Sequence, residues 1–165
     1  YNYCFGDPVG LIDPSGLIVF YHGPGASAGL GRGNEGDSTN FMSASGYTYR
    51  GTTKEGGTER GVAGSISGGR IVGGVLGAGY EGGVFFGDVE DFSGIGTSVG
   101  IAFGPFNIEA TFDANGDSWT GINGGVFRSW GLGLYAEETH TGRIPLGHSS
   151  DPNTINSTGK APNMK

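Results

Sequence analysis

Glycine is the residue that most constrains how this chain can fold, because it occupies 37 of 165 positions. A glycine in the interior of a helix costs about 1 kcal/mol relative to alanine, so this abundance opposes long helices. The glycines follow no Gly-x-y period, which excludes a collagen triple helix. Aromatic residues make up 12% of the chain, and such rings need a packed environment. The composition therefore indicates a folded domain with little helix.

Apolar and polar residues alternate with a period of two over most of residues 40–138, as they do in strands with one buried face. The clearest example is the segment 106–113. Its apolar residues share one face and its polar residues share the other: Phe106, Ile108, Ala110 and Phe112 against Asn107, Glu109, Thr111 and Asp113. This pattern predicts that the apolar face packs on a core and that the polar face is solvated.

A turn signal follows this segment at Asp113-Ala114-Asn115-Gly116-Asp117. Because Asn-Gly tolerates the positive φ of tight hairpin turns, segments 106–113 and 118–127 are expected to pair antiparallel. Further strands are expected at 17–21, 40–51, 59–67, 70–79, 83–87, 97–103 and 126–138, joined by polar or glycine-rich linkers. The predicted fold is all-β and mostly antiparallel, a glycine-rich meander that closes as a barrel or folds as a sandwich.

Glycines inside strands need large side chains to cover the bare backbone. We expect aromatic rings to lie across these glycine strips, and the candidates are Tyr47, Tyr49, Phe85, Phe86, Trp119, Trp130 and Tyr135. The stretch 71–87 has an alternative interpretation. Glu81 interrupts its apolar run, which disfavours a membrane-spanning helix, but alternating glycine and apolar residues also suit a β-hairpin that inserts into a membrane.

The charge balance and the single cysteine exclude several classes of protein. Nine basic and sixteen acidic residues leave a net charge of −7, which disfavours nonspecific nucleic-acid binding. Cys4 is the only cysteine, so neither an internal disulfide nor a cysteine-based zinc site is available. We assign no metal ligands, and the sequence identifies no cofactor.

No motif of a known catalytic class is present: there is no Gly-x-Ser-x-Gly elbow, Walker loop, His-Glu-x-x-His or Cys-x-x-Cys. Glu137, Glu138 and His140 form the one local group that combines carboxylates with a side chain titrating near neutrality. Such a group can act as a general acid and base, so these three are the candidate catalytic residues. The alternative is a solvated strand end, and whether the chain is an enzyme stays open.

The first seventeen residues differ in character from the rest. Pro8 and Pro14 fix their own φ and favour extended conformations for the residues before them, while Gly10 and Gly16 can adopt the positive φ of tight turns. Two Asp-Pro-x-Gly units therefore predict two successive turns. The segment runs from Tyr1-Asn2-Tyr3 to Asp13-Pro14-Ser15-Gly16-Leu17.

This segment resembles the end of an Rhs/YD-repeat core, which has the form Tyr-x-Tyr, a short Asp-Pro turn and then Asp-Pro-x-Gly-Leu. The resemblance covers about a tenth of the chain and stops at Leu17. It implies a junction between a β-strand shell and a variable effector, made of Asp13, Pro14, Gly16, Leu17 and Ile18. In that family the shell cleaves after the leucine, so the cut is expected between Leu17 and Ile18, with Asp13 assisting.

The resemblance and the residue pattern together predict three parts: residues 1–17 as the end of an Rhs core, 18–146 as a glycine-rich β effector domain, and 147–165, which have no apolar period, as a flexible tail. It implies a polymorphic toxin region of unknown target, with the upstream shell of the same polypeptide and a cognate immunity protein as partners. No secretory signal opens the sequence, so we expect the domain to be secreted or delivered into a target cell as part of a larger protein. The alternatives are a pore-forming β toxin that acts on the target-cell membrane and a non-toxic structural or adhesive β domain.

Overall fold

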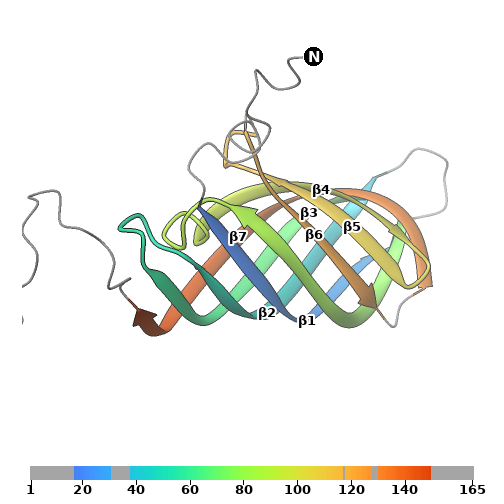
Figure 1. Cartoon of the computed structure of the whole chain (residues 1–165). Coiled ribbons are helices and arrows are strands. Elements are labelled where there is room, and N and C mark those ends of the chain that lie inside the picture. The colour runs from blue at the N-terminus through green and yellow to red at the C-terminus, as the bar shows by residue number, and fades with distance from the viewer. Residues whose placement is uncertain (1–16, 31–37, 117, 128–129, 150–165) are drawn as a thin grey trace, which may run out of the picture.

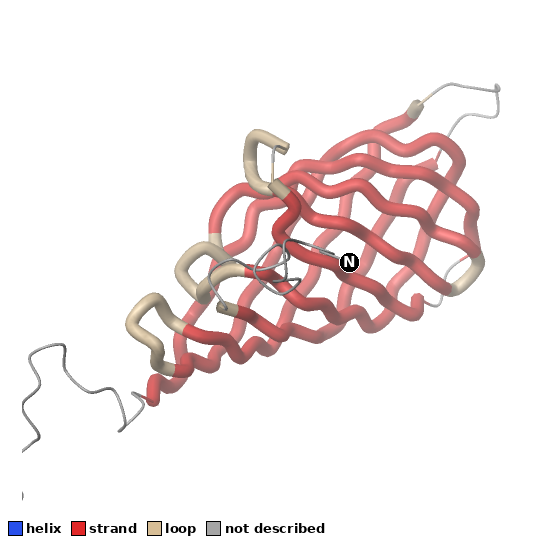
Figure 2. The backbone as a smooth tube through the Cα atoms, turned by 45° about the horizontal axis from the view of Figure 1, so that its top comes forward, coloured by secondary structure: helices blue, strands red, loops and turns tan. Residues whose placement is uncertain are grey.

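The computed structural model describes residues 17–30, 38–116, 118–127 and 130–149 (Figure 1). Their regular secondary structure is β-strand, as the continuous lattice of strands in Figure 2 shows. Among these residues no helix is long and apolar enough to cross a bilayer. The predicted all-β class is therefore confirmed.

The described residues form seven strands: β1 (Ile18–Leu30), β2 (Thr39–Thr52), β3 (Thr58–Phe86), β4 (Gly94–Phe103), β5 (Phe106–Phe112), β6 (Trp119–Phe127) and β7 (Trp130–Ser149). They pair antiparallel in the order β1-β2-β3-β6-β5-β4-β7. Strand β7 also pairs with β3, which closes β3, β6, β5, β4 and β7 into a ring. The sheet is therefore a closed barrel, one of the two predicted arrangements, with β1 and β2 added to it.

Strand β3 reverses its direction within its own length. Val19 of β1 pairs with both Gly51 and Phe85, and Gly51 pairs with Glu59. The two ends of β3 thus lie on either side of the β1–β2 hairpin, and the strand must bend between them. Gly73 lies at this bend with φ of 100°, a left-handed conformation that favours glycine.

The predicted hairpin is confirmed, since β5 pairs with β6 in antiparallel register. The backbone N–H of Asp113 donates to the carbonyl oxygen of Ser118 over 3.0 Å, and the N–H of Gly116 donates to the carbonyl of Asp113 over 3.0 Å. Gly116 has φ of 78°, which the Asn-Gly signal anticipates.

Several predicted boundaries are wrong, among them the end of the first strand, which is Leu30 and not residue 21. The expected strands 59–67, 70–79 and 83–87 are one strand. Gly68, Gly69 and Gly82 are paired with residues of β1 and β2 and do not terminate it. Strand β7 continues to Ser149, beyond the predicted tail boundary at residue 146. Residues 141–149 lack an apolar period, yet they are held by pairing with residues 58–65 of β3. Backbone hydrogen bonds fix these nine residues without help from side-chain patterning.

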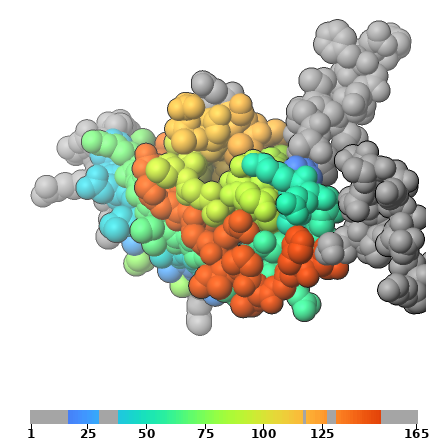
Figure 3. All heavy atoms as spheres, turned by 90° about the vertical axis from the view of Figure 1, so that its left-hand side faces the viewer, coloured from blue at the N-terminus to red at the C-terminus, as the bar shows by residue number. Residues whose placement is uncertain are grey.

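Apolar side chains fill the barrel in two separate clusters. The mouth cluster comprises Val19, Tyr21, Tyr49, Ala63, Val89 and Phe92, and the inner cluster comprises Phe41, Ile71, Val75, Ala102 and Tyr135. Val89 and Phe92 come from the turn after β3, which lies across one end of the barrel. Figure 3 views this end, where the yellow-green turn lies between the teal β2–β3 turn and the amber β5–β6 turn.

The predicted orientation of segment 106–113 is wrong. Phe106 and Ile108 are 47% and 49% exposed, whereas Glu109 is 8% exposed. The same inversion holds in β4, where Val99 and Ile101 face outward and Ser98 is buried. A period of two shows which residues share a face, but the direction of that face depends on the whole barrel. Here Glu109 points inward, to the hydroxyl of Tyr135.

Two of the seven candidate rings, those of Tyr49 and Tyr135, cover interior glycines as predicted. A Cβ placed on Gly61 would lie 2.7 Å from the hydroxyl oxygen of Tyr49, and one placed on Gly100 would collide with the ring of Tyr135. Any larger residue at these two glycines would therefore displace a ring from the barrel interior.

Candidate functional site

Three glutamates lie inside the barrel between the two apolar clusters. Glu81 of β3, Glu109 of β5 and Glu137 of β7 each occupy an inward position and are 7%, 8% and 7% exposed. All three line one small cavity. We name them the interior acidic layer. Buried carboxylates are costly unless they are paired or hydrogen-bonded, so their partners decide what the layer can do.

Hydroxyl groups of β2 hold Glu81. The hydroxyl of Tyr47 donates to Oε1 of Glu81 over 2.7 Å, and the hydroxyl of Ser45 donates to the same oxygen. Burial raises the pKa of Tyr47, and the charge of Glu81 raises it further. Tyr47 therefore stays a neutral donor to this carboxylate.

Burial raises the pKa of Glu109 to about 7. The neighbouring hydroxyls of Ser98 and Tyr135 oppose this rise, because a donor stabilises the ionised carboxylate, while the charge of Glu81 adds to it. The hydroxyl of Tyr135 donates to Oε2 of Glu109 over 3.1 Å. Glu109 thus gains or loses its proton close to neutral pH.

Burial also raises the pKa of Glu137, to about 8, and the charge of Glu109 is the second cause. Ser43 donates to Oε2 of Glu137 over 3.3 Å and partly offsets the rise. Next to it, the hydroxyls of Ser67 and Thr139 lie 2.8 Å apart in a hydrogen bond. At neutral pH the layer therefore carries less than the full charge of its carboxyl groups.

No basic side chain neutralises the layer in the part of the chain that the structure describes. The ion pairs there join Lys54 to Asp88 and Asp91, His140 to Glu138, and Arg143 to Glu59. Glu59 is the fourth buried glutamate, and its Oε1 is paired with Arg143 and accepts a hydrogen bond of 2.7 Å from the Tyr49 hydroxyl. The interior acidic layer, by contrast, has no basic partner among the described residues.

Two connected spaces surround the layer. The inner one, of about 50 Å³, is lined by the three glutamates together with Asn107 and Asn123. The outer one, of about 450 Å³, extends toward the barrel end that Figure 3 shows. The two share the lining residues Tyr47, Ser65, Glu109, Asn123 and Thr139. Of the acidic layer, Glu109 therefore borders both spaces.

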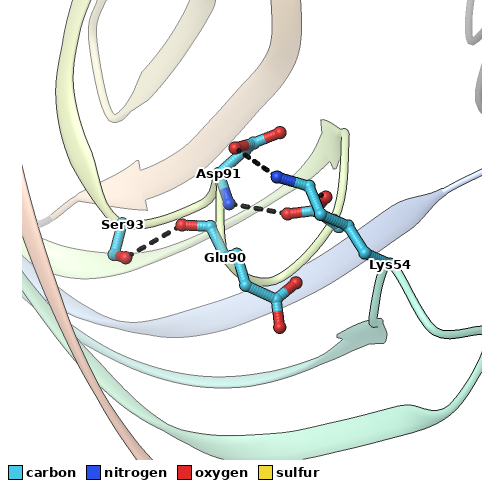
Figure 4. Close-up of polar contacts among 5 residues, drawn as sticks. Lys54, Glu90, Asp91 and Ser93 are labelled. Carbon is cyan, nitrogen blue, oxygen red and sulfur yellow. Dashed lines mark hydrogen bonds and ion pairs between the residues drawn. The ribbon is translucent and has the colours of Figure 1, made fainter.

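The turn at this end is tied to the barrel by polar contacts (Figure 4). Lys54 lies 3.4 Å from Oδ1 of Asp91 and 3.4 Å from Oδ2 of Asp88, and Ser93 donates to the carbonyl of Glu90 over 3.1 Å. The N–H of Asp91 donates to Oδ1 of Asp88 over 2.7 Å. These contacts close the turn on itself and fix it above the mouth cluster.

The structure does not bring the three candidate catalytic residues into one site. Glu137 points into the barrel, whereas Glu138 and His140 lie on its outer surface, where Nε2 of His140 is 2.9 Å from Oε1 of Glu138. Adjacent residues of a strand face opposite ways, which explains the separation. His140 borders a shallow outer groove of small residues from β1, β2 and β3.

Of the junction residues, Asp13, Pro14 and Gly16 lie outside the described part of the chain. The carbonyl of Leu17 accepts a hydrogen bond of 3.0 Å from the N–H of Gly87. The N–H of Ile18 donates to Oγ1 of Thr52 over 2.9 Å. The two residues on either side of the expected cut are therefore held at the start of β1.

The outer surface of β4, β5 and β6 is apolar, and β3 and β7 continue it. Cross-strand neighbours form three rows: Leu132, Phe103, Phe106, Val126 and Tyr80; Leu134, Ile101 and Ile108; and Val99, Ala110 and Ile122. All of these but Ala110 are large hydrophobic side chains that are 39% exposed or more. We name these rows the outer apolar face.

Charged side chains on the outside lie elsewhere. Arg50 and Arg60 are opposite each other next to the β2–β3 turn, and Arg70 donates to Ser38 over 3.1 Å. Glu138 is on β7, further along that strand than the apolar rows. None of the rows contains a charged residue. The outside of the barrel is therefore divided into an uncharged face and a face with arginines.

Sequence reasoning missed Glu81 and Glu109 as parts of a site. The available signal was weak, since Glu81 stands among glycines and Glu109 is one of several polar residues in an alternating strand. They are 28 residues apart along the chain, and only barrel closure brings them together. Comparison with known proteins adds nothing here, because no family model, curated protein or solved structure matches the chain.

Proposed function

We propose that residues from Ile18 onward are the effector region of an Rhs-type polymorphic toxin and that the target of this effector is the lipid membrane. The outer apolar face is the observation that carries the proposal. Its three rows cross five strands without a charged residue. Monomeric soluble proteins rarely expose continuous apolar surfaces of this kind, and such surfaces mark interaction sites.

The inside of the barrel supports lipid as the partner. Membrane β-barrels combine an apolar outside with a polar inside, the reverse of soluble proteins. Here Glu81, Glu109, Glu137 and Asn123 form a buried polar layer between the two interior apolar clusters, while Phe103 and Leu134 are exposed on the outside. A membrane strand needs about 9 to 11 residues; β4 and β6 have 10 and 9, and β5 between them has 7.

The positions of the charged outer residues are compatible with a barrel that contacts the acyl chains of a bilayer through one side only. A charge at the bilayer centre costs about 2–4 kcal/mol in barrels of this type and much less at the interface. Arg50 and Arg60 lie next to the β2–β3 turn, where headgroup phosphates could accept their hydrogen bonds. The β4–β5–β6 side is then the part that faces the acyl chains.

The Rhs resemblance supplies the context of this proposal. The upstream shell would cover the apolar face until the cut after Leu17 releases the domain, and a cognate immunity protein would block the released domain. The domain would act after delivery into a target cell. A partner protein that covers the same face permanently would make the domain structural instead.

The test is co-flotation of the full chain with vesicles of phosphatidylethanolamine and phosphatidylglycerol. The informative variant is Ile108→Asp, which places a charge in the middle of the outer apolar face. Its matched control is Thr48→Asp, which places the same charge on the exposed outer side of β2. We expect the wild type and Thr48→Asp to float with the vesicles and Ile108→Asp to remain in solution.

Equal flotation of both variants, or none by the wild type, would overturn the membrane target. Growth of a bacterium that expresses the chain then distinguishes a structural domain from an enzyme. Indifference of growth to the chain would favour a structural or adhesive domain. If His140→Ala and Glu138→Gln abolished toxicity while flotation persisted, the domain would be an enzyme, and the membrane would not be its target.

A further inference from the structure

We propose that the interior of the barrel is a binding site for a small organic cation that carries N–H donors, such as an aliphatic diamine. The site consists of the interior acidic layer and the two connected spaces around it. This inference goes beyond the membrane proposal, since it concerns the inside of the barrel and a soluble ligand.

The first argument is the uncompensated acidity of the site. Glu81, Glu109 and Glu137 line the same inner space, and within the described residues none of them has a basic partner. Their contacts are with neutral hydroxyl groups, for example Tyr47 to Glu81 at 2.7 Å and Tyr135 to Glu109 at 3.1 Å. A cation from outside would supply the missing charge.

The second argument is independent of charge and comes from an unpartnered amide. Oδ1 of Asn123 is buried and accepts no hydrogen bond, and its residue is 6% exposed. Asn123 lines both the inner and the outer space. Oδ1 of Asn107, which lines the inner space, is also unpartnered. Both atoms are acceptors, so the group that satisfies them must be a donor.

The third argument is the shape of the approach. The outer space of about 450 Å³ has the volume of a small-molecule pocket. Aromatic rings line it, including Tyr21, Tyr47, Phe85 and Phe92. Ring faces attract alkylammonium groups. An amine can therefore rest among the rings while its other end reaches the inner space of about 50 Å³.

The same features disfavour a metal ion. A hard cation such as Ca²⁺ needs about six to eight converging oxygen ligands. Among the described residues, no three histidine, cysteine, aspartate or glutamate side chains are placed to hold one ion. The carboxylates of the layer line the same space without converging on one point, which suits an organic cation with more than one donor group.

Binding of a cation should release protons. The titratable groups that face the layer come from four strands in addition to β5: Tyr21 of β1, Tyr47 of β2, Glu81 of β3, and Tyr135 and Glu137 of β7, whereas β4 and β6 contribute the neutral Ser98 and Asn123. Since burial raises the pKa of Glu109 and Glu137, whichever of these two carboxyl groups is protonated gives up its proton when it pairs with an ammonium group.

The experiment is calorimetry of the full chain in detergent micelles with 1,4-diaminobutane as the probe. The neutral isostere 1,4-butanediol and calcium chloride are the comparison ligands. We expect the diamine alone to bind, with an affinity that rises from about pH 6 to about pH 9 as the carboxyl groups ionise. The heat should depend on the ionisation enthalpy of the buffer, which reports released protons.

Two variants locate the site. Glu137→Gln should weaken diamine binding at least about tenfold, as expected for loss of one close charge pair. Glu138→Gln, at the next residue but on the outer surface, should bind as the wild type does. Far-UV circular dichroism checks that both fold. Absence of diamine binding, equal binding of butanediol or calcium, or wild-type binding by Glu137→Gln would overturn the proposal.

Discussion

The hydroxyl of Tyr135 donates a hydrogen bond to Oε2 of Glu109 over 3.1 Å and thereby joins β7 to β5 across the barrel interior. The ring of Tyr135 also stacks on Phe41, with 4.8 Å between the ring centroids. One side chain thus belongs to the inner apolar cluster and donates a hydrogen bond to the acidic layer. Packing of the apolar cluster therefore controls where the donor to Glu109 lies.

The first prediction concerns this hydrogen bond. Tyr135→Phe removes a donor to the carboxylate of Glu109, so the pKa of Glu109 should rise further above its ordinary value. The unfolding free energy should fall by about 1–3 kcal/mol, because a buried acceptor loses its partner. Carboxyl carbon chemical shifts measured against pH would report the change.

Tyr80→Phe is the control for this variant. Tyr80 is 54% exposed on the outside of the barrel, where its hydroxyl contacts His22. Its replacement removes the same group without touching the layer, so the titration of Glu109 should be unchanged. An equal shift in both variants would show that the Tyr135 hydroxyl does not act on Glu109.

The second prediction is that the barrel loses stability as pH rises from about 5 to about 8.5. The pKa values of Glu109 and Glu137 are raised from 4.5 to about 7 and about 8 in the folded chain. The folded state then binds more protons than the unfolded state, so this contribution is fully present below about 4.5 and is lost as pH rises through the folded values. Denaturant titrations across this range should show a fall on the order of a few kcal/mol.

Glu137→Gln should flatten the upper part of this dependence, because the amide does not ionise. Glu138→Gln should leave it unchanged, since Glu138 is exposed and paired with His140. A stability that increased toward alkaline pH in the wild type would mean that Glu109 and Glu137 are ionised in the folded barrel at neutral pH.

The all-β class and the β5–β6 hairpin could be predicted because their signals are local, whereas the closed barrel was one of the two arrangements that the strand pattern allowed. Alternation places Phe106 and Ile108 on one face, and Asn115-Gly116 fixes the turn between the two strands. The direction of that face could not be predicted in the same way. It depends on whether the environment of the barrel is water or lipid, and alternation looks the same in both cases.

The site depends on contacts between residues far apart in sequence. Glu137 was a candidate because Glu138 and His140 are its neighbours along the chain, but the structure places it with Glu81 and Glu109 instead. These three meet only after β3 bends near Gly73 and β7 closes on it. No spacing in the sequence encodes that closure.

The third prediction compares a ring inside the barrel with one outside it. Phe92 is 9% exposed and packs on Tyr21, Tyr49 and Phe85, with ring centroids 5.1 to 5.7 Å away. Phe92→Ala should therefore lower the unfolding free energy by about 3–5 kcal/mol. Phe106→Ala, at 47% exposure, should cost less than about 1.5 kcal/mol in the same denaturant titration. Equal costs would mean that the inward and outward faces are assigned incorrectly.

The last prediction concerns processing at the junction in the full-length parent protein. If the proposed Rhs-type junction is cut after its leucine, between Leu17 and Ile18, Asp13→Ala and Leu17→Gly should each block release of a fragment that begins at Ile18. Thr52→Val is the control, because it removes the side-chain partner of the Ile18 N–H without changing the motif. It should loosen the start of β1 and leave cleavage intact. Intact mass and N-terminal sequencing distinguish the outcomes, and unchanged release in both junction variants would show that the motif does not direct the cut.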